Sequence, residues 1–267
     1  MASVNDLILV VLLLSVIVPL GALVLISFLP PGEYTIPPQH PTLSNYAYVI
    51  EKLGFQQNMF NTFVFITLAV IISLVLAIPT SYAIARLPIR YEVWAATVAL
   101  VILAKSVPPG SLLVPIYDWL WRLKLTNTPL GVALSYQVYT LPYTIWLLTS
   151  FFLDLPREIE VAARLDGAGS FDRLRHIILP VSIPGIISVV IMNYLNLWNE
   201  YMYSSVMVSS SRLQTAAVVL GQMVTSEYVV EWGIMAAANI LSIIPALLFV
   251  TFVQKNISKA ITGGIKG

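Results

Sequence analysis

The chain has 267 residues, a net charge of +1 at pH 7 and 58% hydrophobic residues, whereas only 10% of its residues are charged. Soluble proteins typically have about 45–50% apolar and about 25% charged residues, so the composition excludes a soluble fold and indicates an integral membrane protein. The charge balance gives no sign of a nucleic-acid partner, which would require a basic patch or stripe. The sequence contains no cysteine, which excludes disulfide scaffolds, thiolate zinc sites and cysteine nucleophiles.

Six stretches of the chain predict membrane-spanning helices. Such a helix needs about 20 mostly apolar residues whose backbone groups are bonded internally. The first stretch lacks the basic start and small-residue cleavage site of a signal peptide, so we interpret it as an anchor. The third is interrupted at Pro108-Pro109-Gly110, where proline predicts a kink or an early end. The expected spans of this all-α domain, which covers residues 1–267, are 7–29, 60–85, 93–117, 128–153, 181–205 and 232–254.

Lysine and arginine are unevenly divided between the segments that join these spans. Cytoplasmic segments carry an excess of both residues. With the amino terminus inside, the inner segments hold Arg86, Arg90, Arg157, Arg164, Arg173, Arg175, Lys255, Lys259 and Lys266. The outer segments hold Lys52, Arg122, Lys124 and Arg212. This excess predicts a multi-pass membrane protein with both termini in the cytoplasm.

The segment between the fourth and fifth spans concentrates charge. Asp154 to Arg175 contains nine of the chain's 27 charged side chains, which comprise 14 basic and 13 acidic residues. Pro156 is typical of a first helical turn and Gly167 of a helix end. Ser170 is expected to cap a second short helix, which Pro180 stops. The sequence therefore predicts two short helices in a cytoplasmic loop over residues 154–180.

Two interpretations of this loop are open. It is either a solvated connector whose charges fix topology or a docking element for another protein. The second helix is expected to present Phe171, Leu174 and Ile178 on one face. Short helices need tertiary packing to persist, and the small Ala162-Ala163 pair leaves a shallow face that a partner groove could receive.

The loop also resembles a known signature. In the permease subunits of binding-protein-dependent ABC importers it is E-A-A, three residues, glycine, nine residues and I-x-L-P. Here Ala162-Ala163 precede Gly167 by that spacing, and Ile177-Ile178-Leu179-Pro180 follow. The glutamate of the signature is Val161 in this chain, which leaves Glu160 or Glu158 as its replacement. A shift of one residue turns a side chain by about 100° around a helix.

Three other segments resemble the carbohydrate-uptake branch, specifically its maltose-type second permease. Trp198-Asn199-Glu200-Tyr201 is similar to its W-N-E-aromatic segment, and Leu141-Pro142-Tyr143 with Trp146 to its fourth span. The ending Ile261-Thr262-Gly263-Gly264-Ile265-Lys266-Gly267 is similar to L-T-A-G-x-V-K-G. The resemblance covers nearly the whole chain.

The resemblance implies a type I ABC importer permease of a prokaryotic plasma (inner) membrane that forms half of a heterodimeric pore. The implied partners are a second permease, two ATPase subunits that bind Mg-ATP, an extracellular sugar-binding protein and the lipid bilayer, but no nucleic acid. Residues implied in coupling to the ATPase are Glu158, Glu160, Ala162, Ala163, Asp166, Gly167, Ala168, Ile177, Leu179 and Pro180. The tail residues implied to reach the ATPase are Gly263, Gly264, Lys266 and Gly267.

Polar residues in the fifth span are candidates for a translocation path. Asn193, Asn196 and Glu200 are spaced by three and four, so they share one helix face. Polar groups at membrane depth usually face a bundle interior or a water-filled route, where Trp198 and the adjacent Asn199 could meet a sugar. The alternative is structural: interhelical hydrogen bonds for the asparagines, and an interfacial position for Trp198 and Glu200.

Motifs for chemistry are missing from the sequence. It has no G-x-x-x-x-G-K-[ST] phosphate loop and no H-E-x-x-H, and its two histidines are expected on opposite sides of the membrane. We therefore expect no catalytic residues, no metal site and no cofactor on this chain. The alternative function is a stand-alone secondary transporter or channel driven by an ion gradient. Such proteins usually show internal repeats and buried titratable relays.

Overall fold

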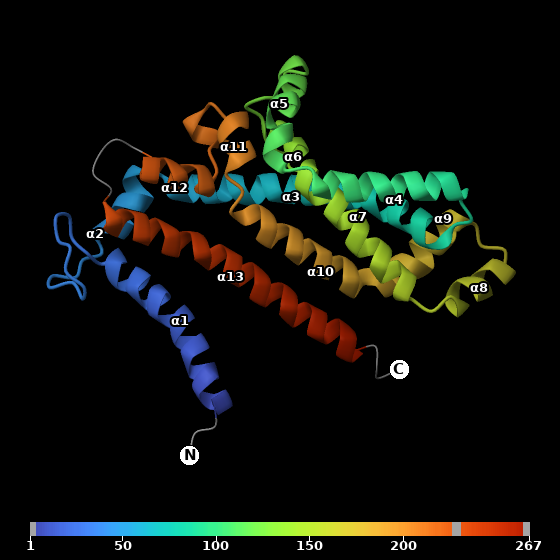
Figure 1. Ribbon diagram of the computed structural model, residues 1–267, viewed down its shortest axis with the longest axis horizontal. Coiled ribbons are helices and arrows are strands. Elements are labelled where there is room, and N and C mark those ends of the chain that lie inside the picture. Colours follow the sequence, from blue (N-terminus) through green and yellow to red (C-terminus); the bar gives the residue numbers. More distant parts are fainter. Residues whose placement is uncertain (1–3, 226–230, 264–267) are drawn as a thin grey trace. The chain divides into compact units, whose positions relative to one another are not determined.

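The computed structural model describes residues 4–225 and 231–263, and all regular elements in these ranges are helices (Figure 1). The α-helices are α1 (Val4–Ser27), α2 (Ser44–Ala47), α3 (Phe55–Arg86), α4 (Tyr91–Ser106), α5 (Leu113–Arg122), α6 (Pro129–Ser135), α7 (Gln137–Asp154), α8 (Glu158–Leu165), α9 (Ser170–Arg173), α10 (Leu179–Trp198), α11 (Met202–Met207), α12 (Ala216–Thr225) and α13 (Trp232–Gly263). Four short 3-10 or π turns complete them: η1 (Tyr48–Lys52), η2 (Pro109–Leu112), η3 (Leu174–Ile178) and η4 (Ser211–Leu213). The all-α membrane fold is confirmed.

Helices long and apolar enough to cross a membrane are found where the sequence predicts spans. Among the described residues they are Asn5–Ser27, Phe55–Arg86, Ser170–Trp198 and Trp232–Phe249. Two bent helix pairs raise the number to as many as six. One is the predicted broken span, in which Tyr91–Ala104 and Pro109–Arg122 meet at 101°. The other joins α7 to α8 at 78°, which separates a span from the first helix of the charged loop.

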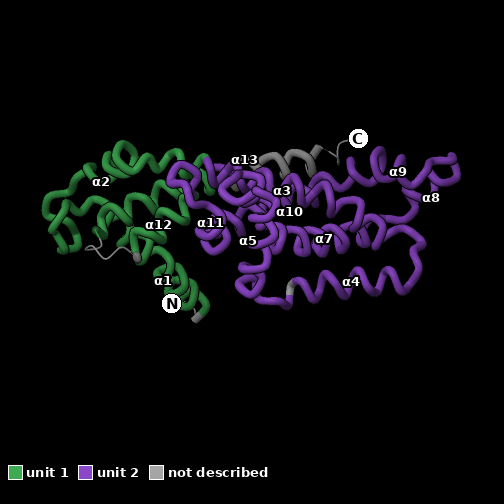
Figure 2. Tube along the Cα trace, turned by 90° about the horizontal axis from the view of Figure 1, so that it is seen from above, with its two compact units in different colours: residues 1–60, 215–247 green, residues 61–214, 248–267 purple. Residues whose placement is uncertain are grey.

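The described chain divides into two compact units, which Figure 2 distinguishes by colour. Unit 1 contains residues 1–60 and 215–247, and unit 2 contains residues 61–214 and 248–267. In unit 1, Val49 and Phe55 pack with the small Ala216, Ala237 and Ala238. The predicted single permease domain over residues 1–267 stays a prediction.

In unit 1, α1 is apolar around its whole circumference. No residue of its most apolar 18-residue window is buried, and the mean hydropathy of that window is 3.1. An exposed surface of this kind is what lipid tails cover. The carbonyls at its end are paired, because the Asn45 amide donates to Ser27 O at 2.9 Å and to Leu29 O at 2.7 Å. A polar side chain thus completes the last turn of this helix.

The core of unit 2 forms between α3, α7, η3 and α10. Its buried apolar residues are Ala77, Tyr82, Ala85, Leu148, Phe152, Leu174, Ile178 and Val189. A polar layer crosses the same helices, because Ser73 Oγ donates to Thr144 Oγ1 at 3.1 Å and Asn193 Nδ2 donates to the same oxygen at 2.8 Å. The helices are therefore held by apolar packing and by interhelical hydrogen bonds.

The second helix of the charged loop differs from the prediction. Pro180 does not stop it, because α9, η3 and α10 form one continuous helix from Ser170 to Trp198. The π turn of η3 directly precedes Pro180, and such widened turns accommodate a missing backbone bond. Ser170 is the first helical residue rather than the cap, which is Gly169. Leu174 and Ile178 are buried as predicted, but Phe171 is 69% exposed, so the expected common face is wrong for Phe171.

A close approach of α7 and α10 requires Gly185. A Cβ at this position would lie 2.6 Å from two atoms of the Phe151 ring. We expect Gly185→Ala to lower the free energy of unfolding by about 1–3 kcal/mol through overpacking. Thermal unfolding of the purified protein in detergent measures the change. Gly21→Ala on α1 is the control, since its Cβ would meet nothing within 4 Å. Equal melting temperatures for both variants would contradict the packing role.

Candidate functional site

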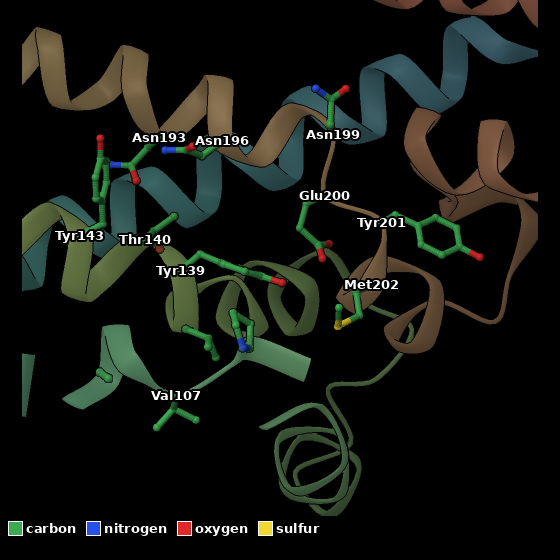
Figure 3. Close-up of a pocket in the computed structure, with 13 residues that line it drawn as sticks. Val107, Tyr139, Thr140, Tyr143, Asn193, Asn196, Asn199, Glu200, Tyr201 and Met202 are labelled. Atoms are coloured by element: carbon green, nitrogen blue, oxygen red, sulfur yellow. The ribbon is translucent and has the colours of Figure 1, made fainter. Parts of the chain in front are cut away.

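A cavity of about 640 Å³ with a mixed apolar and polar lining opens in unit 2 where α10 ends (Figure 3). Its walls come from α4 and η2, from α7, and from α10 with the start of α11. The lining residues are Ala104, Val107, Pro109, Val138, Tyr139, Thr140, Tyr143, Asn193, Asn196, Asn199, Glu200, Tyr201 and Met202. It therefore combines aromatic rings with amides, a composition that suits ligands rich in hydroxyl groups.

The asparagines of α10 have different roles in the cavity wall. Asn193 is 1% exposed and its amide is used by Thr144, so it is part of the interhelical polar layer. Asn196 and Asn199 are exposed and line the cavity. The structure thus places one of the predicted path residues in a structural hydrogen bond and leaves the other two facing open space.

Glu200 and Trp198 lie beside these amides. The Glu200 carboxylate accepts hydrogen bonds from Tyr203 N at 2.9 Å and Ser204 N at 3.2 Å, so it caps the first turn of α11. The Trp198 side chain is buried and does not line the cavity. Glu200 therefore has a structural role as a cap and also lines the cavity, while the predicted interfacial position of both residues stays a prediction.

Tyrosines on α7 complete the cavity, and sequence reasoning did not identify them as site residues. Tyr139 packs edge-on against Tyr203, with ring centroids 5.5 Å apart and an interplanar angle of 84°. Tyr203 Oη donates to Pro109 O at 2.7 Å, which joins α11 to η2 at the broken span. The spacing of Tyr139 and Tyr143 by four residues was the available signal, because it places both rings on one face of α7.

The helix pair, α8 and α9, lies at one end of unit 2 (Figures 1 and 2). Gly167 joins its members with φ +86°, the positive angle that the glycine at this position predicts. Ala168 N donates to Ala163 O at 2.9 Å and Gly167 N donates to Arg164 O at 3.2 Å. These two bonds form a Schellman motif, which fixes the direction of the chain after α8.

An ionic cluster, formed by Tyr82, Arg86, Glu160 and Arg173, connects α8 to the rest of unit 2. Tyr82 Oη donates to Glu160 Oε1 at 2.7 Å. Arg86 Nη1 and Arg173 Nε each lie 3.7 Å from a Glu160 oxygen. Sequence reasoning placed only Glu160 among the coupling residues and counted Arg86 and Arg173 only as inner basic residues. The i, i+4 spacing of Tyr82 and Arg86 was an available signal, because it places both on one face of α3.

Other predicted coupling residues lie on the surface or in the helix that follows. Glu158, Ala162 and Asp166 are exposed on or directly after α8. Ile177 is in η3, while Leu179 and Pro180 begin α10. Of the predicted tail residues, Gly263 ends α13, and Gly264, Lys266 and Gly267 lie outside the described residues. Within the described ranges, no group of three or more His, Asp or Glu could hold a metal ion.

The described residues thus combine helices long enough to span a membrane, a cavity at a helix break and an exposed helix pair at one end of unit 2 (Figure 1). The chain belongs to the family of binding-protein-dependent transport system inner membrane components, which matches residues 53–263. The resemblance inferred from the signature is therefore confirmed, and the chain is an inner membrane component of such a system.

Individual relatives agree with this assignment. The chain is 31% identical to the sulfoquinovosyl glycerol transport system permease protein of Agrobacterium fabrum, over 86% of this chain and 80% of the relative. It is 27% identical to the trehalose/maltose transport system permease protein of Thermococcus litoralis, over 85% and 82%. Its fold matches a chain of a bacterial ABC transporter involved in the import of the acidic polysaccharide alginate, with a TM-score of 0.79, 21% identity and 94% coverage of both chains.

The role of Glu200 as a cap can be tested by its removal. We expect Glu200→Ala to lower the free energy of unfolding by about 1–3 kcal/mol, because two backbone N–H groups lose their acceptor. Thermal unfolding measures this loss, with the exposed neighbour Asn199→Ala as the control. A Glu200→Ala protein as stable as the control would show that the carboxylate is not needed to cap α11.

Proposed function

We propose that this chain is a permease subunit of an ATP-driven, binding-protein-dependent carbohydrate importer and forms half of its pore. The observation that carries this proposal is the family match over residues 53–263. Relatives are named for the transport of sulfoquinovosyl glycerol, diacetylchitobiose and trehalose/maltose, which are all carbohydrates or glycosides. The family assignment also favours an importer subunit over a stand-alone secondary transporter or channel.

The proposed complex contains a second permease, two ATPase subunits and an extracellular sugar-binding protein. Mg-ATP would bind to the ATPase subunits, so this chain would carry no cofactor and no catalytic residue. The excess of lysine and arginine in the predicted inner segments supports placing both termini in the cytoplasm. One solved neighbour is an alginate transporter in complex with a pentasaccharide-bound periplasmic protein, which supports a similar assembly.

The cavity at the end of α10 is the proposed part of the sugar route that this subunit contributes. Asn196 and Asn199 can exchange hydrogen bonds with sugar hydroxyls, and Tyr139 and Tyr143 offer rings against which a sugar can stack. Asn193 and Glu200 also line this cavity, and the buried Trp198 directly precedes Asn199 in the chain. Together these residues form the proposed translocation path.

The helix pair is the proposed connection to the ATPase. Val161 and Leu165 on α8 are 54% and 84% exposed, and Phe171 on α9 is 69% exposed. An apolar helix face beside the small Ala162 fits a partner groove. ATP binding would move the pair and bias the pore between inward-facing and outward-facing states. It can do so only to the extent that the ATPase binds the two states differently.

Co-purification separates this proposal from its alternative. A tag on this chain should retain a second permease and an ATPase from membranes of the native organism. Reconstituted vesicles that contain this chain alone should move no solute. Solute movement without an ATPase would support the gradient-driven alternative.

Asn196→Leu tests the proposed path. We expect uptake to fall at least tenfold while the complex still assembles, because Asn196 is exposed to the cavity and its amide would be replaced by an apolar group. Uptake of the sugar that the binding protein of the system retains measures the effect. Met192→Leu, at another exposed position one turn earlier on α10, should transport normally. Normal uptake by Asn196→Leu would contradict the path.

Gly167→Val tests the turn between the two helices of the pair. Because Gly167 has φ +86°, a β-branched side chain is strained there, and we expect loss of transport and of ATPase stimulation. Gly169→Ala is the matched control, since Gly169 has φ −66°. The hypothesis fails if Gly167→Val retains both activities.

A further inference from the structure

The first helix of the pair is held in an unusual way. α8 has eight residues and none of its side chains is buried. An isolated helix of this length is marginal in water, so its position requires contacts from elsewhere. Its apolar Val161 and Leu165 are 54% and 84% exposed, so they bury little apolar surface within the chain.

Among the charged side chains of α8, that of Glu160 is the least exposed to solvent. It is 13% exposed, while its partners Arg86 and Arg173 are 2% and 10% exposed. Its Oε1 receives the hydrogen bond from Tyr82 and faces Arg173, and its Oε2 faces Arg86. One carboxylate therefore meets two guanidinium groups and a phenol that come from α3 and α9.

The two arginines are themselves fixed to neighbouring backbone. Arg86 donates from Nε to Phe152 O at 2.8 Å and from Nη2 to Leu155 O at 2.5 Å, so it pairs the carbonyls at the end of α7. Arg173 donates from Nη1 to Ala168 O at 2.8 Å, directly after the Gly167 turn. Through them, Glu160 is connected to the ends of α3 and α7 and to the start of the long helix that contains α10.

A cavity of about 430 Å³ lies between α8 and the end of α3, lined by Ala85, Arg86, Leu87, Pro88, Arg157, Glu160, Val161, Arg164 and Arg173. This space is open to the surface, so close packing does not hold α8 on this side. The contacts of Glu160 with Tyr82, Arg86 and Arg173 lie at its edge.

We propose that Glu160 is a positioning residue that latches α8 to the ends of the spans. This inference rests on the proposed coupling function and deepens it. In the latched state, a displacement of α8 by the ATPase pulls on α3, α7 and α9 together. Because Glu160 is paired with residues of this chain, the exposed Glu158 is the carboxylate of α8 that can bind the ATPase.

Hydrogen exchange and coupling, measured on the tagged complex as purified, test the latch. We expect Glu160→Gln to accelerate amide exchange in residues 158–166 at least tenfold, with α3 and α10 unchanged, because the two arginines lose their counter-charge. Transport per ATP hydrolysed should fall at least fivefold. Glu92→Gln is the matched control, since the Glu92–Arg90 ion pair at 3.5 Å is exposed on both sides.

Further variants separate the possible outcomes. Tyr82→Phe removes one hydrogen bond and no charge, so it should accelerate the same amides about three- to tenfold. If Glu160→Gln does not assemble, Tyr82→Phe decides the question alone. The latch is overturned if both variants show the amide exchange and the transport per ATP hydrolysed of the wild type. If only Tyr82→Phe assembles, the same result in that variant overturns it. Absence of a co-purifying ATPase overturns the proposed function instead, and exchange in the chain itself still tests the latch.

Discussion

A helix that ends inside a bundle or a bilayer leaves backbone groups that water cannot reach, and this constraint organises the structure. An unpaired carbonyl or amide in that environment costs several kcal/mol, on the order of a whole buried side chain. The protein meets the constraint with polar side chains at the breaks. Asn45 pairs carbonyls at the end of α1, Arg86 pairs those at the end of α7, and Glu200 pairs amides at the start of α11.

The same breaks carry the proposed functions. After α10 ends at Trp198, the chain turns and lines the cavity before α11 begins. After α7 ends at Asp154, the chain continues into the helix pair. Irregular backbone within a bilayer is tolerated where it is buried in protein or lines a cavity, as the break after α10 does. A pairing group at a break therefore also fixes the geometry of a site.

Sequence reasoning succeeded where one residue type has one strong local consequence. Gly167 was predicted to mark a helix end, and it follows the end of α8 with a positive φ that a side chain would disfavour. Sequence reasoning failed where the surrounding structure outweighed the local preference of a residue. Pro180 continues a helix because a π turn precedes it, and Phe171 left its predicted apolar face for the surface. On α10, the spacing predicted one polar face. It did not predict that Asn193 bonds to Thr144 while Asn196 is exposed to the cavity.

By itself the sequence determined the class of protein, the approximate spans and the family, because composition, apolar length and a spaced signature are properties of the chain alone. Only the tertiary structure decided which polar residues are committed to the bundle and which face open space. Tyr82 and Glu160 are 78 residues apart in the chain, yet they share a hydrogen bond. Their meeting depends on the path of every helix between them, and periodicity within one helix cannot encode that path.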